Sequence, residues 1–306
     1  MSHDVILQPQ FVPGVRGKLL AVQFVPRLSE GRGRPLLLFP PFAEELVKSR
    51  RMLSLLARLV AKDKPLRYVD THAGAGGYDL RTPAAHRNRE HEAGAGKLWT
   101  VSAAPDAISR WLALARRYNG HGPPKRYPGS PWLAQQLLRP IDDLFLFELH
   151  PTEHRALKKN CGSDRRTRVL RDDGLTASIG LVPPPSKRAL LLVDPSYELR
   201  DEHRNVIDAV VKLHKRFATG VIAIWFPVIE RRWVERYERA LRATGIRQIA
   251  AYELCVARER RDGGLVGSGV FVVNPPWQVG DELISALPWL ADRLAVDAGA
   301  SFRATS

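Results

Sequence analysis

Short apolar runs alternate with amphipathic segments along most of this chain, and several of the runs end in an acidic residue. The runs at 66–70, 144–148 and 189–194 read LRYVD, LFLFE and ALLLVD. Runs that are apolar at every position are typical of buried parallel strands. Segments with apolar positions at helical spacing lie around them, at 44–62, 105–118, 151–160 and 203–217. The alternation predicts an α/β fold built around a parallel sheet.

The last third of the chain changes this pattern. Shorter strands are predicted at 168–170 and 221–226, and two long apolar runs follow at 247–256 and 265–273. A charged, glycine-containing segment joins the two long runs, which predicts an antiparallel pair. A parallel sheet that ends in an antiparallel hairpin is the Rossmann-like architecture of S-adenosylmethionine-dependent methyltransferases. We expect this fold class.

The first two predicted strands are far apart in the chain. Asp70 ends one and Glu148 ends the other, whereas a nucleoside-binding βαβ unit separates its glycines from the acid by about 20 residues. Residues 80–140 are therefore predicted to be a helical insertion. The insertion is basic, with Arg110, Arg116, Arg117, Lys125 and Arg126. A solvated surface is one interpretation of these charges, and a nucleic-acid contact is the one we favour.

Composition and charge narrow the class of partner. The 306 residues carry a formal net charge of +15 and are 44% hydrophobic, so a large core is expected together with a polyanionic partner, either nucleic acid or an acidic membrane. No apolar run approaches the ~20 residues of a membrane span, and the chain opens without a signal-peptide pattern, so we expect no membrane partner. Cys161 and Cys255 are the two cysteines, which excludes a disulfide framework and predicts a cytoplasmic location.

The residues that follow the run at 189–194 suit the recognition of an amine. Asp194 is followed by Pro195, Ser196 and Tyr197. The carboxylate of Asp194 and the carbonyl of Pro195 can both accept hydrogen bonds from an NH2 group, and Tyr197 can stack on a base. Ligands of open α/β sheets bind at such strand ends. The alternative is an ordinary Asp-Pro turn.

Three further segments have the chemistry of a nucleoside site. A glycine-rich turn at 71–77 follows Asp70, and such turns bring backbone amides close to a nucleotide-like ligand. Glu148 can accept hydrogen bonds from ribose hydroxyls, and Asp173 with Gly174 at another strand end can meet an adenine ring. An ordinary βα turn and plain loop chemistry are the respective alternatives.

Residues 1–43 differ from the rest, and we expect them to be an atypical N-terminal extension ahead of a methyltransferase domain at 44–306. The extension holds candidate strands at 18–25 and 35–39. The segment 39–52 resembles the start of an α/β-hydrolase of the kind associated with exosortase systems. Because no Gly-x-Ser-x-Gly elbow occurs in the chain, a hydrolase nucleophile is missing.

Ordered segments between about residues 44 and 292 resemble the RlmJ family, which methylates N6 of an adenine in 23S ribosomal RNA. The segments are KDKP (62–65), YVDTHAGAG (68–76), RYPGSP (126–131), ELHP (148–151), DG (173–174), DP (194–195), KRFATG (215–220), GSG (267–269) and NPPW (274–277). The resemblance implies S-adenosyl-L-methionine as the cofactor, bound by His72, Ser130, Glu148, Asp173, Gly174 and Asp194. It also implies a catalytic role for Asp194, Pro195 and Tyr197, no metal, and docking of RNA on the insertion. We expect a monomer that acts on unassembled or partly assembled 23S RNA.

Two positions depart from the family pattern. The family has a second proline where this chain has Ser196. On the helix at 44–62, Lys48 matches a family lysine, but Ser49 replaces a histidine that contacts the cofactor. Lys48 and Ser49 are therefore candidate cofactor residues in an altered pocket wall. The departures make an RNA-binding protein without turnover the alternative function.

Two other motifs imitate functional sites. Residues 274–277 read Asn-Pro-Pro-Trp and match the amine-gripping pattern, but they follow an antiparallel strand and should open on the opposite edge of the sheet. His150 and His154 fit an inverted zinc-protease pattern, which needs both histidines on one helical face. Pro151 is predicted to begin the helix and to leave His150 outside it.

Overall fold

The computed structural model describes residues 41–82, 96–197, 201–260, 263–277 and 279–305. The candidate strands at 18–25 and 35–39, and with them the first residues of the hydrolase-like segment, lie outside these ranges. Within the described ranges, none of the helices has the length and apolar character needed to cross a membrane.

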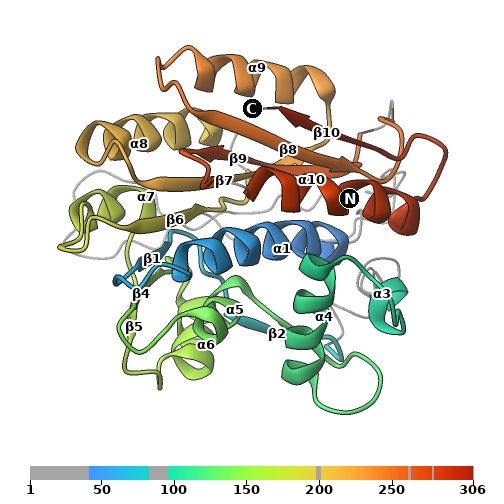
Figure 1. Cartoon of the computed structure of the whole chain (residues 1–306), viewed down its shortest axis with the longest axis horizontal. Helices are drawn as coiled ribbons and strands as arrows, with labels where there is room; N and C mark the ends of the chain where they lie inside the picture. The colour runs from blue at the N-terminus through green and yellow to red at the C-terminus, as the bar shows by residue number, and fades with distance from the viewer. Residues whose placement is uncertain (1–40, 83–95, 198–200, 261–262, 278, 306) are drawn as a thin grey trace, which may run out of the picture. The chain divides into compact units, whose positions relative to one another are not determined.

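Eight strands form one sheet whose five consecutive strands β5, β4, β1, β6 and β7 are parallel (Figure 1). The order across the sheet is β10-β8-β9-β7-β6-β1-β4-β5. The bounds are β1 Arg67–Asp70, β4 Asp143–Phe147, β5 Thr167–Leu170, β6 Ala189–Val193, β7 Val221–Val228, β8 Ile249–Cys255, β9 Gly267–Val273 and β10 Ser301–Thr305. The predicted α/β fold with a mostly parallel sheet is confirmed.

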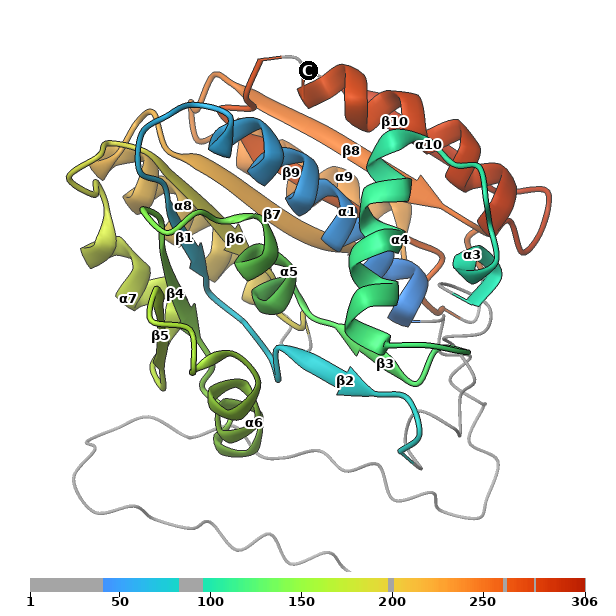
Figure 2. The same cartoon turned by 60° about the horizontal axis from the view of Figure 1, so that its bottom comes forward.

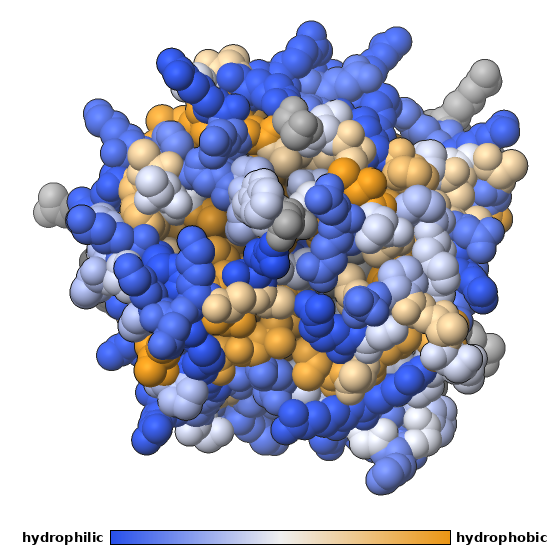
Figure 3. Space-filling view, in the orientation of Figure 1, coloured by the Kyte–Doolittle hydropathy of each residue, from blue (hydrophilic) through white to orange (hydrophobic). Residues whose placement is uncertain are grey.

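Helices cover both faces of this sheet. They are α1 Pro41–Val60, α3 Lys97–Trp99, α4 Asp106–Asn119, α5 Ser130–Leu137, α6 Pro151–Cys161, α7 Gly174–Ala177, the 3-10 helix η2 Ser178–Leu181, α8 Glu202–Arg216, α9 Arg231–Arg242 and α10 Val279–Leu294. α1, α4, α5 and α10 contribute to the core on one face, and α8 and α9 to the core on the other (Figure 1). On the face that carries α1 and α10, hydrophilic residues surround smaller apolar areas (Figure 3).

The central strands are apolar because both of their faces are buried. In β6, Leu190 and Leu192 pack into the core on one side, and Leu191 and Val193 pack into the core on the other. Side chains alternate along a strand, so a strand covered by helices on both sides needs an apolar residue at every position. For this reason the run at 189–193 is apolar at every position.

The predicted antiparallel pair is present as β8 and β9, and β9 is inserted between β7 and β8. It pairs antiparallel with both neighbours, so that Val273 lies opposite Ile222 in β7 and opposite Ile249 in β8. A further strand, β10, pairs antiparallel with β8 at the edge of the sheet. The last residues of β9 thus reach the edge where the parallel strands begin.

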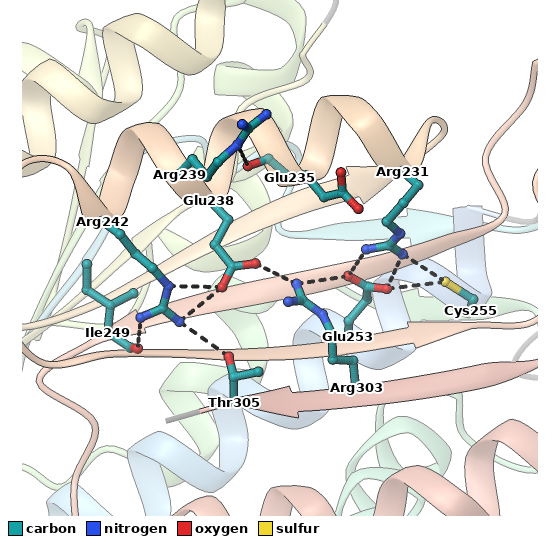
Figure 4. A network of polar contacts seen from close by, with 10 residues as sticks. All are labelled: Arg231, Glu235, Glu238, Arg239, Arg242, Ile249, Glu253, Cys255, Arg303 and Thr305. Carbon is teal, nitrogen blue, oxygen red and sulfur yellow. Dashed lines mark hydrogen bonds and ion pairs between the residues drawn. The ribbon is translucent and has the colours of Figure 1, made fainter.

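A polar network attaches β10 to its neighbours (Figure 4). Glu253 in β8 is buried and forms ion pairs with Arg231 of α9 and, at 3.4 Å, with Arg303 of β10. Arg303 also lies 2.8 Å from Glu238 of α9. A strand without a fully buried residue is therefore attached to the sheet by charge-assisted hydrogen bonds as well as by its backbone pairing.

The chain between β1 and β4 builds a separate layer beside the sheet (Figure 2). It includes β2 Gly77–Asp79 and β3 Arg126–Pro128, which pair antiparallel in a two-stranded sheet. α4 contacts β3 and packs with Trp111 completely buried. α5 follows β3 and packs on α1, so this part of the chain shares the core of the main sheet.

Candidate active site

Three acidic residues meet at one edge of the sheet. Asp70 is the last residue of β1, Glu148 follows β4, and Asp194 follows β6. β1 lies between the other two strands, and its Asp70 is in register with Leu146 of β4 and Leu192 of β6. The carboxyl ends of three adjacent parallel strands therefore bring the three acids together, as expected for a ligand site in an open α/β sheet.

The glycine-rich turn after β1 is ordered by Glu148. The amide of Gly74 donates to Oε2 of Glu148 at 2.9 Å, and the amide of His150 donates to Oε1 at 2.7 Å. Gly74 and Gly76 have φ values of +56° and +74°, a left-handed conformation that favours glycine. The turn can therefore fold back against the end of β4 and place backbone amides at the sheet edge.

Asp70 is the centre of the buried hydrogen bonds at this edge. Its Oδ2 accepts from the hydroxyls of Tyr68 at 3.0 Å and Ser130 at 2.8 Å, and its Oδ1 accepts from the amide of His72 at 3.3 Å. Asp70 was not among the predicted site residues, although its position at the end of the first predicted strand could have identified it as one. It connects β1, the glycine-rich turn and the start of α5.

The edge is electrostatically negative. Burial, followed by the carboxylates of Asp70 and Asp194, raises the pKa of the Tyr68 phenol well above its usual value. Both carboxylates thus disfavour ionisation of this phenol in β1. A cationic group would be stabilised here, because opposite charges attract strongly where water is partly excluded.

Asp173 and Gly174 lie at the end of β5, directly beside the first turn. Asp173 caps α7 by accepting from the amide of Leu175 at 3.1 Å and from the hydroxyl of Thr176 at 2.7 Å. A Cβ atom on Gly174 would lie 2.2 Å from the carbonyl oxygen of Thr71, so only glycine permits this close approach. The two segments form one continuous wall.

Tyr197 is anchored on the neighbouring strand. Its hydroxyl donates to the carbonyl of Trp225 in β7 at 2.6 Å and lies 3.2 Å from the hydroxyl of Tyr237 in α9. Trp233 meets its ring edge-on, with centroids 5.5 Å apart. Burial raises the pKa of the Tyr197 phenol well above its usual value, so the phenol stays protonated. The stacking role predicted for this ring stays a prediction.

The other predicted positions surround the edge. Pro195 is buried and Ser196 is exposed, while Asp194 is half-buried between β1 and β7 in the sheet order. The ring of His72 has its Nδ1 2.7 Å from the hydroxyl of Thr71. Lys48 and Ser49 belong to α1, and Ser49 is completely buried. Their predicted contact with the cofactor stays a prediction.

The two imitating motifs are placed elsewhere. Asn274 follows β9 at the edge where β7 begins, and its side-chain amide donates to the carbonyls of Ala218 at 2.7 Å and Gly220 at 2.8 Å. It therefore fastens a loop on the edge opposite the acids, as predicted. α6 begins at Pro151 and leaves His150 outside, which confirms the argument against a helical zinc pair. In the described ranges, no three His, Cys, Asp or Glu side chains gather around a metal position.

Comparisons with known proteins find a matching family profile and similar curated proteins. A family profile described as "Ribosomal RNA large subunit methyltransferase D, RlmJ" matches residues 63–304. Two curated proteins, both named "Ribosomal RNA large subunit methyltransferase J", are similar to the chain. The one from Escherichia coli (strain K12) is 38% identical over 240 residues, 78% of this chain and 86% of its own. The one from Haemophilus influenzae (strain Rd) is 36% identical over 259 residues, 84% of this chain and 92% of its own.

A solved structure has the same fold over nearly its whole length. It is the crystal structure of a protein from Legionella pneumophila that is 31% identical, with a TM-score of 0.80. The match covers 87% of this chain and 97% of the other. The arrangement of strands and helices described above is therefore shared with an experimentally determined structure.

Proposed function

The chain belongs to the RlmJ family of ribosomal RNA large subunit methyltransferases, and from this membership we propose that it transfers a methyl group from S-adenosyl-L-methionine to N6 of an adenine in 23S ribosomal RNA. The observation that carries the proposal is the meeting of Asp70, Glu148 and Asp194 at the carboxyl ends of adjacent parallel strands. In this proposal residues 44–306 are the methyltransferase domain, residues 80–140 are its insertion, and residues 1–43 are an extension.

The part of the edge formed by β1, β4 and β5 suits the cofactor, which supplies an electrophilic methyl group on a cationic sulfonium. Each carboxylate oxygen of Glu148 accepts one backbone amide and has a further lone pair for a ribose hydroxyl. Asp173 and Gly174 would meet the adenine ring. Asp70 and Asp194 would stabilise the positive charge, while His72 and Ser130 hold the turn and the end of β1 in place.

Asp194 and Pro195 would hold the target amine. The lone pair of an adenine N6 is delocalised into the ring, which makes the nitrogen a poor nucleophile. Accepting its two hydrogens on the Asp194 carboxylate and the Pro195 carbonyl favours a tetrahedral nitrogen with its lone pair aimed at the methyl group. After transfer the nitrogen carries a surplus proton, which Asp194 can accept or pass to water.

Tyr197 would stack on the extruded base. A base inside an RNA stack has to be unstacked before it can enter such a pocket, at a cost of a few kcal/mol. Stacking on an aromatic ring offsets part of this cost. The bond from the Tyr197 hydroxyl to the carbonyl of Trp225 fixes the orientation of the ring, so little order has to be gained when the base arrives.

The insertion would dock the RNA. A cavity of about 470 Å³ on its surface is lined by residues that include Trp99, Arg117 and His121. An aromatic ring beside cationic groups suits a base and its phosphate. Arg116 holds the cavity wall, because its guanidinium donates to the carbonyls of Trp99 at 2.7 Å and Val101 at 2.9 Å.

A methyl-transfer assay with radiolabelled cofactor on unmodified 23S RNA fragments tests this function. We expect label to appear in one adenine as N6-methyladenine, with naked or partly assembled RNA preferred over the finished subunit and with the protein acting as a monomer in the cytoplasm. Cofactor binding without label in any fragment would instead favour the alternative, an RNA-binding protein that has lost turnover.

A further inference from the structure

A rigid turn after β9 displays an exposed tryptophan at the edge of the sheet opposite the acids. The side chain of Trp277 is 82% exposed, although the turn that carries it is tightly held. Asn274 donates through its side chain to the carbonyls of Ala218 and Gly220, and its amide donates to the carbonyl of Gln248 at 2.9 Å. Two prolines follow it, and Arg58 donates to the carbonyl of Trp277 itself at 3.1 Å. An exposed ring on a fixed backbone is already arranged for binding.

Basic residues surround this ring. A cavity of about 460 Å³ beside Trp277 is lined by residues that include Arg58, Lys62 and Arg188. A second cavity shares Lys62 and Arg188 and adds Lys64, Lys187 and a single acid, Asp63. Within the described part of the chain, none of these five basic side chains forms an ion pair. Their positive charges are therefore available to an anion.

Arg188 is held at this surface by neutral partners. Its guanidinium donates to the carbonyls of Leu59 and, at 2.5 Å, Lys64, which order the loop but do not neutralise the charge. Burial, followed by the charge of Arg139, lowers the pKa of Arg188, and the carboxylate of Asp142 opposes this change. A phosphate bound at this place would stabilise the charged guanidinium.

We propose that this surface, formed by Arg58, Lys62, Lys64, Lys187, Arg188 and Trp277, is a second RNA-binding site that takes an unpaired nucleotide of the substrate RNA at a distance from the target adenine. The base would stack on Trp277, and the adjoining phosphates would lie on the basic side chains. Stacking on an aromatic ring beside cationic groups is how proteins bind single-stranded RNA without reading its sequence.

The site is separate from the catalytic edge. Arg188 precedes β6 and Asp194 follows it, and a strand of this length separates the two by about 20 Å. RNA that fills both sites must therefore extend beyond the nucleotides around the target base. This inference rests on the proposed function, because it assumes that the bound polyanion is the RNA that is methylated.

RNA binding by variants of this surface tests the proposal. We would measure the affinity of the full-length protein for a 23S fragment that is methylated and carries flanking single strands, and for the same fragment without those strands. Trp277→Ala should weaken binding of the longer fragment about tenfold, within the range for loss of one stacked base, and leave binding of the shorter fragment unaffected. Trp277→Phe should retain most of the affinity. In Trp277→Ala, the cofactor affinity and kcat should equal those of the wild type, while the KM for the longer RNA rises.

A pair of substitutions that removes two positive charges provides the second arm. Lys62→Gln with Lys64→Gln should reduce the log–log salt slope by about 1.4, which is about 0.7 for each phosphate contact on a single strand. Arg232→Gln with Arg236→Gln, which removes the same charge from exposed positions of α9, is the matched control and should change the slope much less.

Two results would overturn the proposal. One is equal binding of the longer fragment by Trp277→Ala and the wild type, which would show that Trp277 does not contact RNA and would favour a protein partner for this ring. The other is equal slopes for the two double variants. If the wild type binds RNA in this way but methylates no fragment, the proposed function fails while this second site stands.

Discussion

The hydroxyl of Ser130 lies 2.8 Å from Oδ2 of Asp70 and donates a hydrogen bond to it, across 60 positions of the chain. Both residues are buried. Asp70 ends the central strand of the parallel sheet, and Ser130 begins α5 in the insertion. The bond therefore connects the layer that we propose docks RNA with the edge that we propose binds the cofactor.

Ser130→Ala should weaken cofactor binding about fivefold. The substitution removes one of the hydrogen bonds that the Asp70 carboxylate accepts, and the loss of such a bond to a charged group costs on the order of 1 kcal/mol or more. Isothermal titration with the cofactor measures the effect. Ser109→Ala, which removes a hydroxyl bond to the carbonyl of Ala104 away from the edge, is the control. Equal affinities for both variants would exclude a positioning role for Ser130.

Asp194→Ala should abolish methyl transfer while cofactor binding persists at reduced affinity. Its carboxylate is one of the two proposed acceptors for the target amine but only one of several groups proposed to bind the cofactor. Asn274→Ala removes the same kind of motif from the opposite edge and should leave the chemical step intact. It should lower stability instead, since its side chain makes two bonds to the 218–220 loop. Single-turnover methylation distinguishes the variants, and exchanged behaviours would show that the two edges are wrongly assigned.

RNA affinity should fall steeply with salt, and the insertion should contribute to the slope. Arg117→Glu with Lys125→Glu reverses two exposed charges and should flatten the slope by at least about 0.7 per lost phosphate contact. Arg116 is better left unchanged, because it holds the backbone of the 99–101 segment. Binding titrations at several salt concentrations measure the slope, and an unchanged slope would remove the insertion from the RNA surface.

Ser196→Pro should accelerate the chemical step. A proline restricts the backbone of the residue before it, so it would fix the direction of the Pro195 carbonyl, the second proposed acceptor. Ser196 is exposed, and its own hydroxyl can bond locally and draw the turn away. A gain of about 1 kcal/mol corresponds to about a fivefold rate. Single-turnover methylation rates of the wild type and the Ser196→Pro variant measure this effect. An equal or slower rate for the proline variant would show that packing already fixes the direction of the Pro195 carbonyl.

The network around Glu253 should make stability depend on acidity. Burial raises the pKa of Glu253, but hydrogen bonds and ion pairing with Arg231, together with the charge of Arg303, outweigh it and leave the pKa below its usual value. A lowered folded-state pKa means that this stabilisation is present above the ordinary value of about 4.3 and is lost as the pH falls through the folded-state pKa.

Glu253→Gln should therefore cost about 1–2 kcal/mol at pH 7, nearer the lower figure because the side chains of both arginines are 35% exposed. The difference from the wild type should shrink toward pH 3. Urea unfolding across this range measures it. A difference that stays constant with pH would mean that the effect comes from packing and not from the charge of Glu253.

Most of the sheet was predictable because its strands are buried on both faces. The runs ending at Asp70, Glu148 and Asp194 were apolar apart from Arg67, and the acid at the end of each indicated the edge that we propose binds ligand. β10 was not predicted, because it is short and has no buried residue, and its Arg303 attaches it to α9 and β8 by ion pairs. α10 was also missed, and it contains Pro288, a residue that usually ends a helix.

The sequence by itself determined the class of fold, the family, and which strand ends carry acids, because these depend on local periodicity and on motifs that are continuous in the chain. Tertiary structure decided which of those motifs meet. The antiparallel direction of β9, which the sequence predicted, takes Asn274 and Trp277 to the edge opposite Asp194. Only tertiary structure inserts β9 between β7 and β8 and brings Ser130 of the insertion to Asp70. Such contacts join residues far apart in the chain, so no local pattern encodes them.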